Sequence, residues 1–246
     1  MPRGGFSAKE EILSSGDAEL DSILDRLEVK GKAVKDLRAR IKKEQIETFP
    51  VPETQVEEGL LLFGRFEPEP KFQVRFDRFV AGGIVRDKPQ DRHWFTFDGR
   101  WLVERNARTR RVIRREAVKA GERIDVFKLG NGPFPLPIGQ SRRDMLSNFK
   151  IVRVPPKGGD PSGSDHFACT PLVGSELHAR YKQVDFYVDR KLELPTRIDV
   201  VRRKDDLEIR VTFDQLEVNV GLAASEFEMP VPADYAVTIE ALESAD

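Results

Sequence analysis

The sequence predicts a mainly β (α+β) fold, in which a single curved antiparallel sheet forms an incomplete β-barrel with covering helices. Apolar and polar residues alternate in several long segments between Leu37 and Val220, and short polar turns join these segments. Only two stretches show the apolar spacing of an amphipathic helix. No linker is long enough to divide the 246 residues, so we expect one domain.

The clearest strands lie between Tyr181 and Pro232. Every second residue is apolar in two of them, at Val184, Phe186 and Val188 and at Leu207, Ile209, Val211 and Phe213. Another strand begins at Leu194-Pro195, where a proline is tolerated. The alternation changes phase at Gln215, which predicts a bulge or bend. Three long strands with short polar turns are typical of an antiparallel meander that has one apolar face.

Two helices are expected to cover this sheet. Asp17 is a good N-cap, Gly31 a plausible stop, and the apolar stripe between them consists of Leu20, Ile23, Leu24 and Leu27. A second, short helix begins at Ser141, after the proline-rich apolar loop 130–137. Its apolar face contains Ile138, Met145, Leu146 and Phe149. The first helix shows only solvated charges on its polar face, so we expect it to cover the sheet rather than to catalyse.

The remaining strands complete the expected sheet. A first strand begins at Leu37, and the next runs over 59–66. Phe72, Val74 and Phe76 then alternate with polar residues, and Asp98-Gly99 predicts a hairpin turn that leads to Trp101 and Val103. Shorter strands are expected at 110–115, 151–154 and 166–170. We therefore expect one continuous antiparallel sheet from Leu37 to Met229, with both helices on its concave side.

Composition argues against several classes of partner. The chain has 41 basic and 42 acidic residues and a net charge of −1, which gives no general attraction to nucleic acid or anionic lipid. The arginines between Arg105 and Arg115 fall on a predicted strand, whose alternate residues point to opposite faces, so their charge is split. No apolar window of about 18 residues exists for a transmembrane segment. No apolar signal region follows Met1, so we expect a cytoplasmic protein or one that begins after a removed targeting segment.

The sequence contains no recognisable catalytic or metal-binding pattern. His93, His166 and His178 lie far apart and lack the spacing of a metal site. Cys169 lies in an apolar run, which is typical of a buried small side chain rather than a nucleophile. There is no Gly-x-Ser-x-Gly elbow and no phosphate-binding loop. We therefore expect no enzyme activity, no metal and no cofactor.

The order of several short motifs resembles the LolA/LolB-like outer-membrane lipoprotein carrier superfamily, in particular its planctomycete-type branch. After the N-terminal amphipathic helix come 59–65 (GLLLFGR), 70–74 (PKFQV), 97–103 (FDGRWLV), 194–198 (LPTRI) and 227–232 (FEMPVP). The branch also has a Gly/Pro-rich Phe-Pro-Leu-Pro insert before the second helix, as found here at 134–137. The resemblance spans roughly residues 18–232.

This resemblance implies a LolA-like incomplete barrel whose apolar concave face holds lipid or lipoprotein acyl chains in the periplasm or cell envelope. In the carriers an arginine before the Pro-x-x-Phe strand helps to hold the helical lid, and Arg65 matches it by its distance from Gly59. The expected cavity and lid residues are Arg65, Phe72, Val74, Phe76, Trp101, Val103, Met145, Leu146, Phe149, Phe186, Val188, Val211 and Phe213. We expect a flexible arm at 1–16, the lipid-binding domain at 17–232 and a C-terminal tail at 233–246.

Periodicity alone leaves two functions open. The apolar face can enclose a cavity for a lipid, or side chains can fill it completely. In the second case the chain is an envelope protein-interaction module that offers an edge strand to a protein partner.

Overall fold

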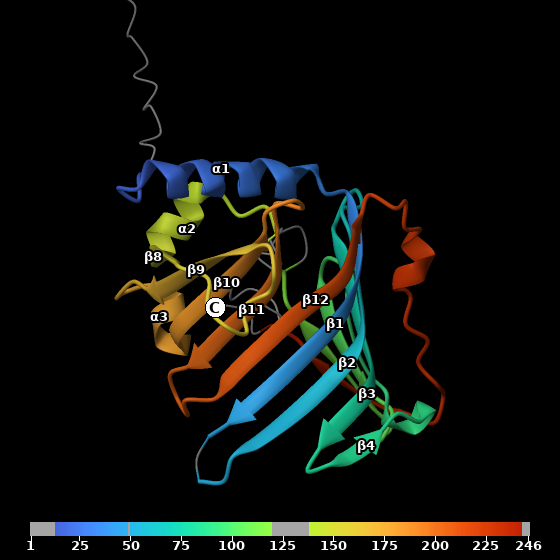
Figure 1. Cartoon of the computed structure of the whole chain (residues 1–246). Helices are drawn as coiled ribbons and strands as arrows, with labels where there is room; N and C mark the ends of the chain where they lie inside the picture. The colour runs from blue at the N-terminus through green and yellow to red at the C-terminus, as the bar shows by residue number, and fades with distance from the viewer. Residues whose placement is uncertain (1–12, 49, 120–137, 243–246) are drawn as a thin grey trace, which may run out of the picture.

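The computed structural model describes residues 13–48, 50–119 and 138–242, which form one strongly curved sheet with a long helix across one end (Figure 1). The helices are α1 (Ala18–Ala33), α2 (Arg142–Asn148) and α3 (Glu176–Arg180), with 3-10 turns η1 (Pro89–Asp91) and η2 (Ala224–Phe227). The first strands are β1 (Asp36–Glu47), β2 (Glu53–Gly64), β3 (Lys71–Ala81), β4 (Ile84–Arg86), β5 (His93–Phe97), β6 (Trp101–Asn106) and β7 (Arg111–Glu116). The later strands are β8 (Phe149–Val154), β9 (Ser164–Pro171), β10 (Tyr181–Asp189), β11 (Leu194–Arg202), β12 (Glu208–Val218) and β13 (Ala236–Glu240).

The predicted N-terminal helix is present as α1. The side chain of Asp17 accepts hydrogen bonds from the backbone N–H groups of Glu19 and Leu20, which confirms it as the N-cap. The helix continues past the expected stop and ends at Ala33, where the N–H of Val34 donates to the carbonyl of Gly31. In Figure 1, α1 lies across the upper end of the curved sheet with α2 beneath its N-terminal half. Its apolar stripe therefore faces the core.

The predicted meander corresponds to β10, β11 and β12, which pair in sequence order and antiparallel. Gln215 has a φ of +51°, in the left-handed region. The register between β1 and β12 shifts at this point, from Arg40 opposite Asp214 to Arg38 opposite Glu217. The change of phase seen in the sequence is thus a bulge, as predicted.

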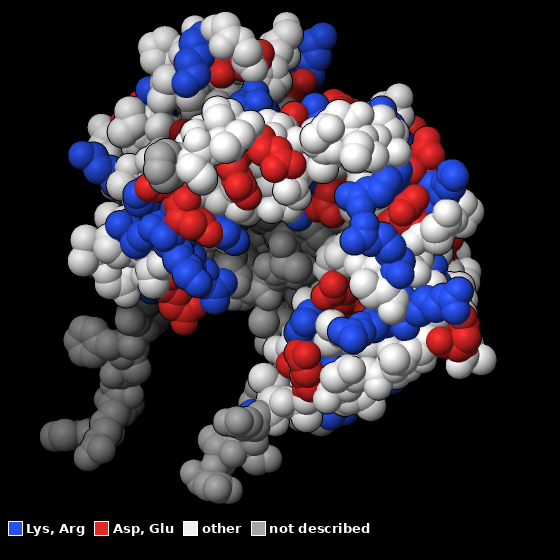
Figure 2. Space-filling view, turned by 90° about the horizontal axis from the view of Figure 1, so that it is seen from below, with Lys and Arg blue, Asp and Glu red and all other residues white. Residues whose placement is uncertain are grey.

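Pairing of β1 with both β2 and β12 joins the two halves of the chain into a single sheet. The strand order is β13-β7-β6-β5-β3-β2-β1-β12-β11-β10-β9-β8, with β4 beside β3. The two ends of this order, β13 and β8, do not pair with each other, so the barrel is incomplete. Seen from the end opposite α1, the molecule is hollowed between two walls whose rims carry residues of both charges (Figure 2).

The sheet differs from the expected one at its C-terminal end. Strand β13 lies beyond Met229, among the residues expected to form a tail, and it pairs parallel to β7 from Ala236 opposite Arg111. The expected antiparallel sheet from Leu37 to Met229 is present, and β13 adds one parallel pairing beyond that range. The segment between η2 and β13 crosses the convex face, and the side chain of Arg105 donates to the carbonyl of Pro230 there. This crossing brings β13 to β7 in the parallel direction.

A further difference is α3, which we did not predict. Ser175 caps it by accepting from the N–H of His178, and Leu177 is buried. Two other expectations fall mainly outside the described residues, namely the proline-rich loop 130–137 and most of the N-terminal arm 1–16.

The main core lies between the concave face and the covering helices. Leu20, Ile23 and Leu24 of α1 belong to the same buried cluster as sheet residues such as Phe63 and Phe76. On the convex face a smaller apolar cluster of Leu62, Leu222 and Phe227 fixes the segment after β12. The apolar stripe that the sequence predicted for α1 is thus buried against the sheet.

Candidate functional site

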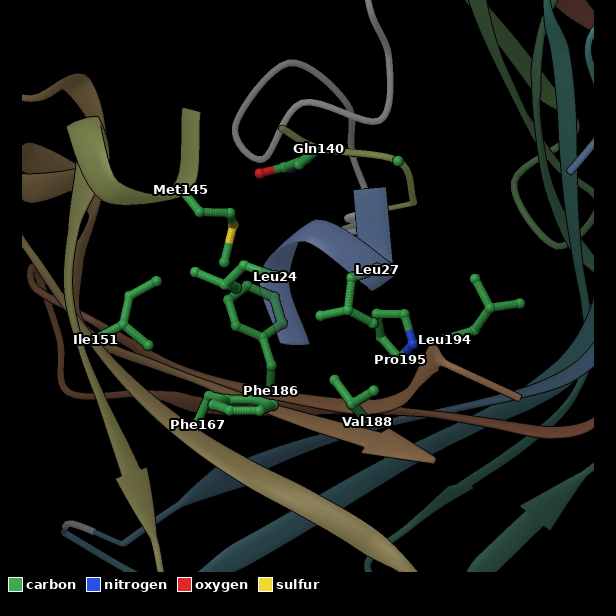
Figure 3. Close-up of a pocket in the computed structure, with 11 residues that line it drawn as sticks. Leu24, Leu27, Gln140, Met145, Ile151, Phe167, Phe186, Val188, Leu194 and Pro195 are labelled. Carbon is green, nitrogen blue, oxygen red and sulfur yellow. The ribbon is translucent and has the colours of Figure 1, made fainter. Parts of the chain in front are cut away.

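An apolar pocket lies where α1 and α2 meet strands β8 to β11 (Figure 3). Leu24 and Leu27 point into it from α1, and Met145 points into it from α2. The opposite wall belongs to the sheet, whose lining residues are Ile151, Phe167, Phe186, Val188, Leu194 and Pro195. Gly139 and Gln140 close it on the loop that leads into α2. The lining can therefore hold an apolar group by burial rather than by charge.

The pocket is almost filled by its own side chains. Its cavity volume is about 30 Å³, enough for about one or two water-sized groups. A long acyl chain does not fit unless the covering helices move away from the sheet. The apolar face is therefore packed in this conformation. A larger cavity can form only if the contacts that hold α1 and α2 on the sheet are broken.

Arg65, directly after β2, binds the C-terminal end of α1. Its Nε donates to the carbonyl of Val34 at 2.9 Å, and its Nη2 donates to that of Gly31 at 3.2 Å. The backbone N–H of Arg65 also donates to the carbonyl of Lys35 at 2.7 Å. Helix C-termini have carbonyl groups without partners inside the helix, and a guanidinium is well suited to satisfy them. Arg65 therefore fixes one end of α1 to the sheet.

Replacement of Arg65 by Met is expected to lower the free energy of unfolding by about 1–2 kcal/mol, because two hydrogen bonds from a charged donor are lost at a partly exposed site. Arg65→Lys should recover only part of this loss, since a single ammonium cannot reach both carbonyl groups in the same geometry. Urea denaturation of the three proteins measures the difference. Equal midpoints for Met, Lys and the native arginine would contradict this role.

A close backbone contact fixes α1 to the loop before α2. A Cβ atom on Gly31 would lie 2.2 Å from the backbone N of Gly139 and 2.4 Å from its Cα. Gly139 has a φ of +79°, which favours glycine. No side chain larger than hydrogen fits at position 31 without separating the two segments. The covering unit is thus assembled around a glycine contact.

Ion pairs join the covering helices to each other and to the sheet. Arg142 of α2 donates to Asp25 of α1 at 3.0 Å, and its backbone N–H donates to the carboxylate of Glu28. Two further pairs join α1 to the sheet, Arg26 with Glu193 and Glu19 with Arg153. None of these contacts belongs to a strand ladder, so α1 and α2 can leave the sheet without breaking one.

Most of the predicted cavity residues do lie on the concave side or in the covering helices. Met145, Phe186 and Val188 line the pocket. Phe72, Val74, Phe76, Val211 and Phe213 are buried in the same core, on β3 and β12. Leu146 is partly buried against this core, whereas Phe149 is buried as the first residue of β8 and not as part of the helix. The predicted residues therefore mark the interior but divide between pocket wall and core.

Trp101 and Val103 were assigned to the wrong face. In the hairpin between β5 and β6, Phe97 pairs with Leu102, so Leu102 shares the concave face with Phe97. Trp101 points to the convex side, where Arg100 and Arg114 lie over its ring at 5.4 and 5.2 Å. A two-residue turn always pairs an odd-numbered residue with an even-numbered one, so the turn signal itself predicts that Leu102, not Trp101, faces inward.

Sequence reasoning missed several pocket residues as functional candidates. Leu24 and Leu27 were recognised as the apolar stripe of a covering helix, but not as pocket lining. Ile151 and Phe167 belong to β8 and β9, whose expected strands were too short to show which face is apolar. Leu194 and Pro195 form the start of β11. Phe167 lies opposite Phe186 in the sheet, and this pairing would have assigned β9 to the pocket wall. It depends on the register of the two strands, which the sequence does not show.

Further towards the open end, the concave face becomes charged. A row of side chains crosses it from Lys43 to Glu57, His93, Glu104 and Arg115, with Lys43 at 2.6 Å from Glu57 and His93 at 2.9 Å from Glu104. Partial burial would raise the pKa of Glu104, but hydrogen bonds from Arg115 and His93 hold this pKa below its usual value. The interior therefore has an apolar end under the helices and a polar end at the opening.

Other reactive groups are engaged or buried. Cys169 has no exposed surface, and burial raises the pKa of its thiol well above the usual value, as expected of a packed side chain. The ring of His166 is stacked on Tyr187, and its Nε2 lies 3.1 Å from Asp185. Within the described ranges, no group of three potential ligands could hold a metal ion. None of the helices described is long and apolar enough to cross a membrane.

The sequence matches no family model and no curated protein, but its fold is similar to solved structures. An uncharacterized conserved protein from Thermus thermophilus is superposed with a TM-score of 0.50 at 10% identity, over 90% of this chain and 99% of that one. A LolA superfamily protein from Nitrosomonas europaea gives a TM-score of 0.39 at 12% identity, over 85% and 96% of the two chains.

Another similar structure is the Pseudomonas aeruginosa MucA/MucB complex, with a TM-score of 0.43 at 16% identity, over 87% of this chain and 62% of that chain. At such identities the likeness concerns the fold alone, and the planctomycete-type branch stays a prediction. The open, mostly antiparallel sheet and its covering helices agree with the fold class expected from the sequence. At a TM-score of 0.50, the chain shares its fold with the Thermus thermophilus protein.

Proposed function

We propose that this chain is a non-catalytic carrier or binding protein that holds the acyl chain of a lipid or lipoprotein between its covering helices and its sheet. The observation that carries this proposal is the apolar pocket under α1 and α2, whose walls include leucine, methionine and phenylalanine side chains from five different elements. An interior of this kind recognises a hydrocarbon chain by the area it buries. We place the protein in the cell envelope, where acylated cargo must be shielded from water.

Uptake requires that α1 and α2 move outward, because the closed pocket holds only about 30 Å³. Each buried methylene contributes about 0.8 kcal/mol, so a chain of ten carbons offers about 8 kcal/mol against the cost of separating the helices from the sheet. Arg65, the contact between Gly31 and Gly139, and the ion pairs of α1 set that cost. In this proposal they keep the apolar interior closed when no cargo is bound.

A charged residue in the pocket wall tests the proposal. Leu27 is half-buried and lines the pocket, whereas Val29, two residues along α1, is 70% exposed. Leu27→Asp is expected to weaken binding of a fluorescent palmitoyl probe at least about tenfold, because a carboxylate facing an apolar pocket loses its hydration. Val29→Asp should bind the probe like the native protein. Circular dichroism checks that both variants keep the sheet.

Absence of saturable probe binding to the native protein, with the sheet intact, would refute the carrier function. Equal loss of binding in both variants would instead place the probe outside the pocket. One observation favours the protein-interaction module as the second candidate: β13 lies at the edge of the sheet, with Val237 and Ile239 more than half exposed. An edge of this kind can accept an extended segment of a partner as a further strand.

A further inference from the structure

A second hollow adjoins the apolar pocket on the side of α1 that faces β8 to β11. Its cavity volume is about 370 Å³, much larger than that of the pocket itself. Leu27 and Val188 line both spaces, so the two meet at these side chains. We call this second hollow the headgroup cleft. If the acyl chain of a lipid enters the apolar pocket past Leu27, the headgroup of that lipid lies in this cleft.

The cleft is lined by charges of both signs. Three arginines are each paired with a carboxylate, Arg26 with Glu193 at 3.0 Å, Arg153 with Glu19 at 2.5 Å and Arg190 with Asp165 at 2.8 Å. Asp189 adds a fourth carboxylate, so three positive charges face four negative ones. Two of the three pairs join α1 to the sheet. Movement of α1 therefore separates charges that need new partners.

We infer that the headgroup cleft binds a zwitterionic lipid headgroup, one that carries a phosphate and an ammonium group. This inference rests on the proposed function and adds to it the chemical class of the cargo. The phosphate would accept hydrogen bonds from Arg26 and Arg153, whose guanidinium groups have several N–H donors each. The ammonium would take the place of these arginines beside Glu19 and Glu193.

The ion pairs of the cleft argue against headgroups that carry only a negative charge or no charge. A purely anionic headgroup would draw the arginines away from Glu19 and Glu193 and leave these carboxylates without a positive partner, in a cleft that already has an excess of negative charge. A headgroup with only a carboxylate or a hydroxyl would also leave Glu19 and Glu193 without a positive partner when α1 moves. A zwitterion adds one charge of each sign, so it offers new partners to both the arginines and the carboxylates that α1 separates, without adding to the negative excess. Arg153 and Arg190 also border a neighbouring hollow of about 260 Å³, so their side chains have room to turn.

Lipids that share a single 16-carbon chain and differ in headgroup test the inference. Displacement of the palmitoyl probe should give the lowest Kd for palmitoyl lysophosphatidylethanolamine, with lysophosphatidylglycerol and palmitate weaker. In Arg153→Gln, binding of lysophosphatidylethanolamine should fall about tenfold, equivalent to about 1.4 kcal/mol, while palmitate, which has no phosphate, should lose less affinity. Lys150→Gln is the matched control, because Lys150 is an exposed residue of the same strand, three positions from Arg153.

Each outcome bears on one proposal. Tighter binding of lysophosphatidylglycerol than of lysophosphatidylethanolamine would overturn the zwitterionic preference. The same would follow if Arg153→Gln bound all three lipids like the native protein, although the acyl-binding function would then stand. If neither palmitate nor either lysolipid displaced the probe, or if the probe itself did not bind, the proposed function would fail, and the inference with it.

Discussion

Phe213→Ala should lower the free energy of unfolding by about 3–5 kcal/mol, the usual cost of removing a core phenylalanine. Phe213 lies on the concave face of β12, is 5% exposed and belongs to the main core. Truncation leaves a cavity that the strands on either side cannot fill, because both are fixed in their ladders. Denaturant unfolding followed by circular dichroism measures the change.

The stability loss of Phe186→Ala, compared with that of Phe213→Ala, distinguishes a residue of the pocket wall from one of the fully packed core. Phe186 is equally buried but lines the apolar pocket, where α1 and α2 can settle onto the truncated side chain. We expect a loss near the lower end of the same range, together with stronger binding of the palmitoyl probe in the enlarged pocket. Val152→Ala, at a half-exposed position on β8, should change stability little. A loss near zero for both phenylalanines would remove them from the interior.

Gly31→Ala is expected to separate the covering helices from each other. The added methyl group would lie 2.2 Å from the backbone of Gly139, so α1 or the loop before α2 must shift. Overpacking of this kind costs about 1–3 kcal/mol. The sheet is not part of the contact, so strand content should stay the same. Stopped-flow measurement should therefore show faster uptake of the palmitoyl probe, because the closed state is destabilised relative to the open one.

A matched control is Gly158→Ala. No atom lies within 4 Å of a Cβ at that position, in the loop between β8 and β9. This variant should have native stability and native uptake kinetics. Unchanged uptake in Gly31→Ala, despite a measured loss of stability, would show that the contact between α1 and the α2 loop does not limit opening.

Local patterns were sufficient to predict most of the elements. Asp17 as N-cap, the stripe of α1, and the alternation in β3 and β12 depend only on neighbouring residues. The bulge at Gln215 was visible because one residue out of phase moves every later side chain to the other face. The short helix α3 was missed because five residues carry too little periodicity.

The candidate site could be predicted only in part. Phe186, Val188 and Met145 were recognised as interior residues because they lie on clear apolar faces. Leu27 and Ile151 were not assigned to a pocket, since nothing in one element shows which residue of another it will meet. Trp101 was assigned to the interior without the pairing rule of the preceding turn, which places Leu102 beside Phe97. Arg65 was predicted from a resemblance, and its bonds to Val34 and Gly31 depend on where α1 ends.

By itself, the sequence determined that this chain forms a curved, mostly antiparallel sheet with one apolar face and helices to cover it. These features follow from periods of 2 and 3.6 residues, which are properties of each segment alone. Tertiary structure decided the parallel pairing of β13, the near-complete filling of the pocket, and the charges of the headgroup cleft. Each of these depends on contacts between segments far apart in the chain, such as Arg26 with Glu193, and on volumes that only packing sets.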